Sequence, residues 1–212
     1  MEYSLTTYNI FKLHLPSSRQ YVGMLEKKND FLVLQEWIES LRIAENKHIV
    51  TESTFTLPLK RVKTGTATIS SYSPISSKSF ISKSRELGCI TPKSALITTY
   101  DLNGRTFTVG NCHALYFVSN AVWKRMIDSW AQDIPKDGSC IVAGDFNTWN
   151  PWRFDHLEKK LQDLGFKYAH YDHNLVMRLD HIWCRDVEIV SCAINMNVHT
   201  SDHYPVTIKF KL

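Results

Sequence analysis

The segment CIVAGDFN, residues 140–147, decides the fold class of this chain. Its first four residues form a short apolar run, which is typical of a strand buried on both sides. Polar Asp145 and Asn147 follow that run. Asn150 and Pro151 then predict the start of a helix, because asparagine is a preferred N-cap and proline suits the first helical position. A buried strand that leads through a polar turn into a helix indicates an α/β fold.

The same order of elements occurs in the first half of the chain. Residues 3–9 and 30–35 are strand-like, and between them a helix is predicted from Ser17 to Lys28, with Ser17 or Ser18 as its N-cap. In the second half, a helix-like segment likewise separates two strands, the later of which is the quoted one. Strand–helix–strand units place helices on the outer faces of sheets. We therefore expect two packed sheets with helices outside them.

Two connecting segments carry further expectations. Asn103-Gly104 lies between two strand-like runs and predicts a type I′ hairpin, since both residues tolerate positive φ. The Ser- and Lys-rich residues 73–85 predict a long exposed connection.

Composition limits the protein class. The chain has 212 residues, of which 43% are hydrophobic and 22% are charged, which is typical of a globular protein. This length predicts one domain over residues 1–212. Lys and Arg number 25 and Asp and Glu 21, so the formal net charge is +4. So mild a positive charge is compatible with a polyanionic partner but does not require one.

Cysteine usage and hydropathy indicate a compartment. The chain has an odd number of cysteines, five, and no C-x-x-C spacing, which argues against a disulfide framework and a structural zinc site. Free thiols are typical of a reducing compartment. We find no secretory signal pattern and no run of 18 apolar residues. The sequence therefore predicts a cytoplasmic protein without a transmembrane segment, and a monomer by default.

Polar residues gather at the ends of the predicted strands, where ligands bind in open α/β sheets. Each alone has a structural explanation, such as a turn residue or a buried histidine, but together they indicate a site. The set consists of Asn9, Glu36, His113, Asp145, Asn147, Asp180, Asp202 and His203.

Spacing separates the members of this set into roles. Asp145 and Asn147 are two apart, so an extended backbone points both to one face. Asp180 lies in an apolar strand, where a carboxylate needs a partner. A histidine held by a buried carboxylate is a better general base. We expect His203 to be that base and Asp180 to orient it.

These segments resemble the endonuclease/exonuclease/phosphatase superfamily, which has the DNase I-like fold. The matching motifs occur in the family's order and span residues 7 to 205. The chain is most similar to small stand-alone bacterial members, which share a TPK segment and a GDFNTW stretch. The motifs are TYNI (7–10), LQE (34–36), GTA (65–67), PI (74–75), TPK (91–93), NCH (111–113), GDFNTW (144–149), LDHI (179–182) and SDHYP (201–205).

The resemblance implies a fold, a reaction and a role for each matching residue. The fold is a four-layer α/β sandwich, with two packed mixed β-sheets flanked by helices. The reaction is hydrolysis of phosphate esters with Mg²⁺, or Mn²⁺, which suits carboxylate and amide oxygen ligands. Glu36, Asn9 and Asp202 resemble the metal ligands. Among the catalytic residues, Asp145 resembles the group that orients the attacking water, Asn147 a phosphate-binding residue, His113 a residue that stabilises charge on the phosphoryl oxygens, and Asp180 with His203 the dyad.

Other residues are candidates for substrate binding. Trp149 and Trp152 follow the GDFN motif, and one of them is expected either to stack on a base or to belong to the core. Arg178 is a further candidate. His170 and His173 have metal-ligand spacing, although a solvated loop explains them equally well.

Three functions remain open from the sequence. The first is a metal-dependent nuclease that acts on DNA or RNA. The second is a phosphoesterase for a small or lipid-linked phosphate ester, and the third is a binding module without catalysis. Abasic-site nucleases have an acidic residue two positions after the asparagine at Asn9, where this chain has Phe11, and only Tyr116 loosely matches their catalytic tyrosine. The substrate motifs of inositol-lipid phosphatases are also missing.

Overall fold

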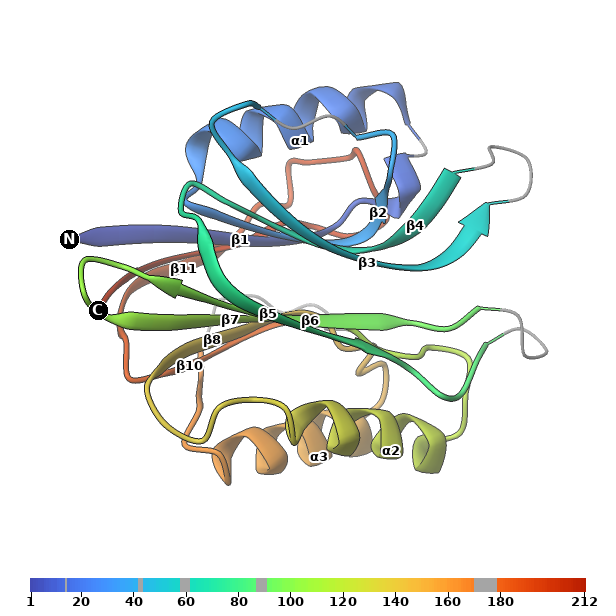
Figure 1. Ribbon diagram of the computed structural model, residues 1–212. Helices are drawn as coiled ribbons and strands as arrows, with labels where there is room; N and C mark the ends of the chain where they lie inside the picture. Colours follow the sequence, from blue (N-terminus) through green and yellow to red (C-terminus); the bar gives the residue numbers. More distant parts are fainter. Residues whose placement is uncertain (14, 42–43, 58–61, 87–90, 170–178) are drawn as a thin grey trace.

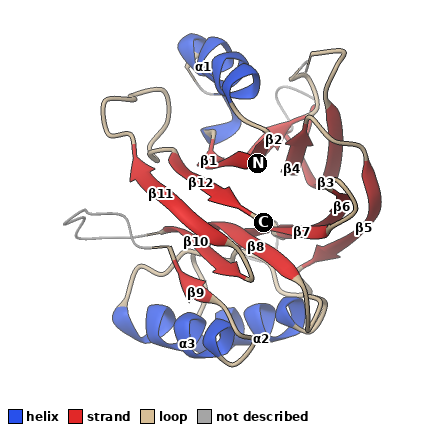
Figure 2. Ribbon diagram, turned by 90° about the vertical axis from the view of Figure 1, so that its left-hand side faces the viewer, coloured by secondary structure: helices blue, strands red, loops and turns tan. Residues whose placement is uncertain are grey.

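The structure is a computed structural model that describes residues 1–13, 15–41, 44–57, 62–86, 91–169 and 179–212. Two six-stranded sheets pack face to face, and helices cover the outer face of each (Figure 1). Helix α1 (Pro16–Lys28) covers the first sheet, and α2 (Asn120–Ala131) and α3 (Pro151–Gln162) cover the second. The expected four-layer α/β sandwich is confirmed. Figure 2 shows the layers from the end at which both termini lie.

The first sheet has the strand order β11-β12-β1-β2-β4-β3. Only its central pair β1–β2 is parallel among the described strands, and the other pairs are antiparallel. Its strands are β1 (Glu2–Asn9), β2 (Phe31–Ile38), β3 (His48–Leu57), β4 (Val62–Ser70), β11 (Glu188–Ile194) and β12 (Val206–Lys211).

The second sheet repeats this plan, with the order β5-β6-β7-β8-β10-β9 and a parallel central pair β7–β8. In both sheets a helix connects the parallel strands, β1–α1–β2 and β7–α2–β8. The echo expected between the two halves of the chain is therefore a repeat of the sheet plan. Its strands are β5 (Pro74–Ile81), β6 (Ser94–Asp101), β7 (Thr106–His113), β8 (Ser139–Asp145), β9 (Lys167–Tyr168) and β10 (Asp180–Arg185).

Strand β2 shows why its sequence is apolar without interruption. Its side chains alternate between two cores, since successive residues of a strand point to opposite faces. Phe31 and Val33 pack into the larger core between the sheets, which continues around α2 and α3. Leu32 and Leu34 pack into the smaller core beneath α1. Burial on both faces favours an apolar residue at every position.

The layer between the sheets changes from apolar to polar along the strands. At the end near the termini, Phe31 and Phe107 pack with ring centroids 5.3 Å apart. Further along, the Gln35 amide donates a 3.0 Å hydrogen bond across the layer to Asn111, which donates at 2.9 Å to the Ala67 carbonyl. Buried polar groups need such partners. The two sheets therefore present polar residues to each other at one end of the sandwich.

Two local expectations were wrong. Residues 74–81 form the edge strand β5 rather than a connection, although most of its side chains are exposed, as the Ser- and Lys-rich composition indicated. Helix α1 begins at Pro16 with Leu15 as its N-cap, and neither Ser17 nor Ser18 caps it. Pro16 takes the first helical position because its fixed φ suits that place. The Ser18 hydroxyl instead donates to the Thr200 carbonyl.

Two other expectations are confirmed. Asn103 and Gly104 have φ values of 58° and 82° in the tight turn between β6 and β7. Asn150 caps α3 by accepting a hydrogen bond from the Arg153 amide at 3.0 Å. Within the described ranges, no helix combines the length and the apolar character needed to cross a bilayer.

Candidate active site

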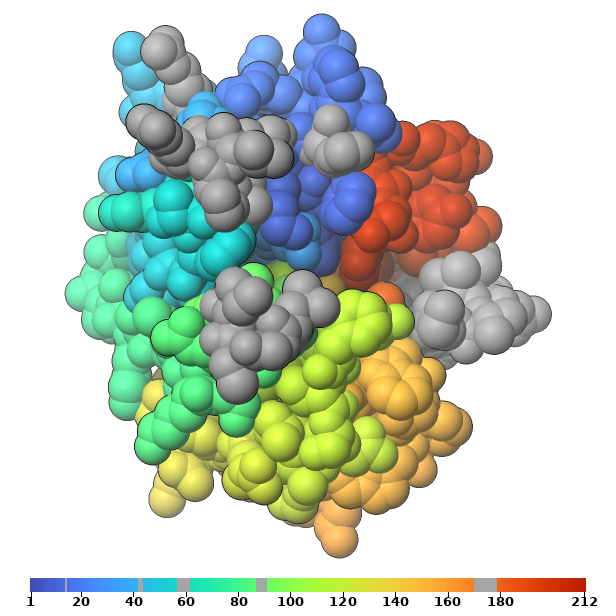
Figure 3. Space-filling view, turned by 90° about the vertical axis from the view of Figure 1, so that its right-hand side faces the viewer, coloured from blue at the N-terminus to red at the C-terminus, as the bar shows by residue number. Residues whose placement is uncertain are grey.

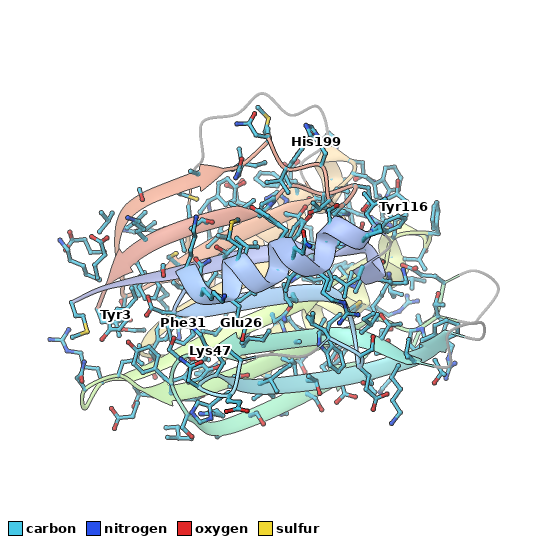
Figure 4. All side chains as sticks on the ribbon, turned by 90° about the horizontal axis from the view of Figure 1, so that it is seen from above. Tyr3, Glu26, Phe31, Lys47, Tyr116 and His199 are labelled. Carbon is cyan, nitrogen blue, oxygen red and sulfur yellow. The ribbon has the colours of Figure 1, made fainter. Side chains whose placement is uncertain are left out.

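A cavity of about 680 Å³ opens at the polar end of the sandwich. Figure 3 views the molecule from this end, where the upper and lower parts meet around a hollow. Tyr116, a lining residue, and Tyr3 lie at opposite ends of the sandwich in Figure 4. The volume falls in the range of small-molecule and cofactor sites. Its lining includes seven of the eight residues singled out at strand ends: Asn9, Glu36, His113, Asp145, Asn147, Asp202 and His203.

Three neighbouring strands of the second sheet align acidic and histidine side chains at one edge. Asp145 of β8 is the register partner of His113 on β7 and of Asp180 on β10. Gly144 precedes it with a φ of 147°, and a Cβ atom there would lie 2.0 Å from the Cys112 carbonyl oxygen. Glycine is therefore required for β7 and β8 to approach each other directly before Asp145.

The GDFN turn fixes its own polar side chains. The backbone amide of Asn147, which has a φ of 51°, donates to Asp145 Oδ1 at 3.0 Å. The Asn147 side-chain amide donates to the Ala114 carbonyl at 2.7 Å. A primary amide has two N–H donors, so this bond leaves one available.

The two sheets meet at Asn9 and Asp145. The Asn9 side-chain amide donates a 3.0 Å hydrogen bond to Asp145 Oδ2, although the residues are 136 apart in sequence. Asn9 Oδ1 accepts the Phe11 amide at 3.1 Å. Both side chains are almost completely buried. The bond therefore sets the orientation of the amide relative to the carboxylate before any substrate binds.

Glu36 is held in the cavity by a distortion of β2. The pairing of β2 with β4 shifts register between Gln35 and Trp37, and Glu36 has a φ of 53°. Such a bulge re-aims a side chain, and positive φ is unfavourable for glutamate. The Glu36 carboxylate forms an ion pair with Lys12, which follows β1, and lies 3.9 Å from the ammonium of Lys93.

His203 forms the expected pair with Asp180. Its Nδ1–H donates to Asp180 Oδ2 at 2.6 Å, and its Nε2 lies 3.8 Å from Asp145 Oδ2. Burial lowers the pKa of His203, but the two carboxylates outweigh burial and raise it to about 10. A pKa raised in this way favours the protonated, cationic form of His203 at neutral pH.

The pKa shifts of Asp145 and His113 both favour the uncharged form of the side chain. Burial raises the pKa of the Asp145 carboxyl to about 7, and the Asp180 charge adds to this rise. Burial and the neighbouring Lys93 cation hold the pKa of His113 well below its usual range. His113 is therefore neutral, and its Nε2 accepts a hydrogen bond from Lys93 at 3.0 Å.

The donor atoms in the cavity fit a hard divalent cation. Glu36 and Asp202 offer carboxylate oxygens and Asn9 an amide oxygen, which are the ligand types of Mg²⁺ and Mn²⁺. The Lys12 ammonium beside Glu36 shows that this carboxylate accepts a cationic partner. A second cluster, Asp145 with Asp180 and His203, brings three ligand-type atoms within 4.8 Å of one another. Because His203 is charged and lies between these carboxylates, this cluster is better suited to handling protons.

The remaining predicted residues fall in different places. Asp202 is exposed at the cavity, and its Oδ1 accepts from the Ser201 hydroxyl at 3.2 Å. Trp149 is not among the described lining residues; its ring packs 4.9 Å from the guanidinium carbon of Arg153. Tyr116 lines the cavity, and its backbone amide is bonded to Glu86. Arg178 lies outside the described residues, as do His170 and His173.

Sequence reasoning missed three charged residues of the cavity, Lys12, Glu86 and Lys93. In the sequence, Lys93 is the last residue of the TPK motif, which carries no assigned role. Glu86 and Lys93 give no periodic signal, because they lie outside the regular strands. Exposed Phe117, whose side chain also lines the cavity, was missed for the same reason.

One family model matches most of the chain. A family model described as Endonuclease/Exonuclease/phosphatase family matches residues 6–203. A UPF0294 protein of Yersinia pseudotuberculosis is 26% identical over 218 residues, which cover 98% of this chain and 83% of that relative.

Solved structures have the same fold. An endonuclease/exonuclease/phosphatase family protein from Leptotrichia buccalis has a TM-score of 0.76 and 14% identity, and the match covers 99% of this chain and all of that one. D. rerio TDP2 complexed with single strand DNA product has a TM-score of 0.70 and 14% identity, with 100% of this chain and 99% of that one covered. At these identities the likeness establishes the fold alone.

Proposed function

The chain belongs to the Endonuclease/Exonuclease/phosphatase family, and on that premise we propose that it is a divalent-metal-dependent nuclease that hydrolyses phosphodiester bonds of DNA or RNA. The family resemblance found in the sequence is thereby confirmed. One observation carries the proposal. Asn9 and Glu36 of the first sheet and His113, Asp145 and Asn147 of the second, which are far apart in sequence, line a single cavity.

The proposed reaction is an in-line displacement. The oxygen of a water forms a bond to phosphorus, and the bond from phosphorus to the leaving oxygen breaks. The proton of the water passes to Asp145. Glu36, Asn9 and Asp202 would hold a divalent cation, which would supply positive charge that offsets the charge of the phosphoryl group. The free amide hydrogen of Asn147 binds a phosphoryl oxygen.

In this proposal Asp145 takes the role of general base expected for His203. A charged imidazole cannot accept a proton, and the carboxylates of Asp180 and Asp145 raise the pKa of His203 to about 10, which favours its charged form at neutral pH. Asp145 has a pKa of about 7, near the value that suits a general base. His203, held by Asp180, donates its Nε2 proton to the leaving oxygen. Water and phosphodiester are thus converted to a phosphate monoester and an alcohol.

Three observations support a nucleic acid as substrate. Aromatic rings of Phe11, Phe55, Tyr116 and Phe117 line the cavity, and bases stack on such rings. The structurally similar TDP2 was solved with a single-stranded DNA product. The net charge of +4 is compatible with a polyanion.

A small or lipid-linked phosphate ester is the second candidate. The same rings, together with Leu179, give the cavity an apolar wall, which suits an acyl or other apolar group equally well. These aromatic and apolar residues do not form a flat basic groove of the kind that binds duplex nucleic acid.

A gel assay tests the proposal. Pure protein is incubated with supercoiled plasmid, linear duplex, single-stranded DNA and RNA, each with Mg²⁺, Mn²⁺ or EDTA, beside the His203→Ala variant. We expect metal-dependent cutting, with single strands preferred, and loss of cutting in the variant. Intact polymers under all conditions would refute the nuclease, and release of phosphate in a screen of small and lipid esters would then establish the second candidate. No turnover in either screen would leave a binding module without catalysis.

A further inference from the structure

Lys93 has a place in the cavity that neither the sequence nor the family match assigns to it. We propose that Lys93 is a catalytic residue whose ammonium binds a non-bridging oxygen of the scissile phosphate, held for this by His113 and Glu86. The inference rests on the proposed hydrolysis of a phosphate ester. It gives Lys93, rather than His113, the role of supplying protein-borne positive charge to the phosphoryl group.

Three elements surround the Lys93 ammonium. Its Nζ lies 3.0 Å from His113 Nε2, 3.6 Å from Glu86 Oε2 and 3.9 Å from Glu36 Oε1. The side chain of Lys93, which directly precedes β6, is 15% exposed, whereas that of Lys78 on β5 is 62% exposed. Lys93 is thus a largely buried cation at the wall of the cavity that also contains Asp145 and Asn147.

The contacts leave donor capacity on the ammonium. A hydrogen bond of this type spans about 2.7–3.2 Å, so both carboxylates lie beyond hydrogen-bond distance. Among the described residues, Nζ forms one hydrogen bond, to the neutral ring of His113. An ammonium has three N–H donors. At 3.6 and 3.9 Å the carboxylates of Glu86 and Glu36 form ion pairs with the ammonium, but neither accepts one of its hydrogens at hydrogen-bond distance. The remaining donors are therefore available to an anionic ligand from outside the chain.

The backbone on both sides of the lysine is fixed. The Lys93 amide donates to the Ser82 hydroxyl at 2.9 Å, and the Lys93 carbonyl accepts the Ser82 amide at 2.9 Å. Glu86 pairs with Thr91 in an isolated bridge, and its carboxylate accepts the Tyr116 amide. Groups held by such bonds keep their geometry during a reaction, as electrostatic stabilisation of a transition state requires.

His113 acts as a positioning residue in this arrangement. A charged ammonium only donates hydrogen bonds, so His113 Nε2 accepts from Lys93 and carries no proton itself. In the proposal this bond positions the Lys93 ammonium toward the phosphate. Lys12 lies on the other side of Glu36 and forms an ion pair with it, so that Glu36 has a cation on each flank.

The test measures binding of inorganic phosphate by calorimetry in the presence of Mg²⁺, because phosphate is common to every candidate substrate. Lys93→Met is compared with Lys93→Arg and with Lys78→Met, which removes an exposed lysine of β5 that pairs with Asp133 outside the cavity. We expect phosphate affinity to fall at least tenfold in Lys93→Met, to recover in part in Lys93→Arg and to be unchanged in Lys78→Met. Thermal unfolding of each variant checks that the fold is kept.

Turnover gives the second readout. Where the wild type cleaves a substrate, kcat should fall by about 10²–10³ in Lys93→Met, as for the loss of one donor to a developing oxyanion. Equal phosphate affinity in Lys93→Met and the wild type, or no phosphate binding by the wild type at 10 mM, would overturn the proposal. If Lys93→Met fails to fold, Lys93→Arg becomes the test. Arginine keeps the positive charge, so complete loss of phosphate binding in a folded Lys93→Arg variant would contradict the proposed role of the cation.

The two proposals fail in different ways. If the protein cuts no nucleic acid yet binds phosphate through Lys93, the nuclease is refuted and the phosphate contact stands. If it cuts nucleic acid at the wild-type rate without Lys93, the nuclease stands and the phosphate contact is refuted.

Discussion

The side-chain amide of Asn9 and the carboxylate of Asp145 join the two sheets of the sandwich through one 3.0 Å hydrogen bond. Each side chain stands at the end of a central strand, β1 in one sheet and β8 in the other. This contact brings the metal-ligand candidates of the first sheet next to the acid–base candidates of the second. The proposed activity therefore depends on how the sheets are packed.

Replacing Asn9 should impair both activity and stability. Asn9→Ala removes a donor from a buried carboxylate, and an unsatisfied buried group costs about 1–3 kcal/mol. We expect the free energy of unfolding to fall by about that amount and the cleavage rate to fall by about 10²-fold. Urea denaturation and initial rates measure the two effects. Wild-type activity in Asn9→Ala would show that the contact across the sheets does not serve the reaction.

Two substitutions at the Glu36 bulge distinguish the cost of backbone strain from the function of the carboxylate. Both Glu36→Ala and Glu36→Gly remove the carboxylate and its ion pair with Lys12, so both should be inactive. Glycine adopts positive φ without the steric cost of a Cβ atom, which is about 1–2 kcal/mol for other residues. We expect the free energy of unfolding of Glu36→Gly to be about 1 kcal/mol higher than that of Glu36→Ala. Equal stabilities would mean that Glu36 is not strained.

His203 should make the metal-free protein less stable in alkali. Its pKa is raised from 6.5 to about 10 in the folded state, so its stabilising contribution is complete below pH 6.5 and is lost as the pH rises through 10. Between pH 7.5 and 10.5 we expect the wild type to lose on the order of 2–3 kcal/mol more than His203→Gln. Urea denaturation in EDTA at both pH values measures this difference. Parallel losses in the two proteins would contradict the assigned pairing with Asp180.

Phe117 should contribute to substrate binding and little to stability. Its side chain is 67% exposed at the cavity, with its ring centroid 4.3 Å from that of Tyr116. Stacking of a base on an aromatic ring contributes about 1–3 kcal/mol, so Phe117→Ala should raise KM for single-stranded DNA by about 5- to 100-fold. Trp152→Ala is the matched control, because Trp152 is 45% exposed and does not line the cavity. Equal effects of the two substitutions would refute the stacking role.

The sequence predicted the elements and the strand ends because these depend on local patterns. The apolar run before Asp145 predicts a buried strand, and strand–helix–strand order predicts helices on the outer faces of the sheets. His113, Asp145 and Asp180 each end or begin a strand, and the register of β7, β8 and β10 aligns them. Periodicity alone did not supply that register.

Tertiary contacts decide the features that the sequence did not predict. The bulge at Glu36 arises from pairing with β4, while the residues around it resemble an ordinary strand. Lys93 and Glu86 meet because both lie between the ends of β5 and β6, and β5 itself was missed since its exposed side chains give no apolar alternation. The charge of His203 follows from two carboxylates on different strands, Asp145 and Asp180.

Hydrolysis of bis(p-nitrophenyl) phosphate tests the central claim most directly, because this phosphodiester requires no recognition of a base or a lipid. Its release of p-nitrophenolate is followed with Mn²⁺ or with EDTA for the wild type, Glu36→Gln and Lys78→Met. We predict Mn²⁺-dependent release that stops in EDTA, falls at least 10³-fold in Glu36→Gln and is unchanged in Lys78→Met. Release that persists in EDTA, or that is equal in Glu36→Gln and the wild type, would contradict a metal-dependent phosphodiesterase at this cavity.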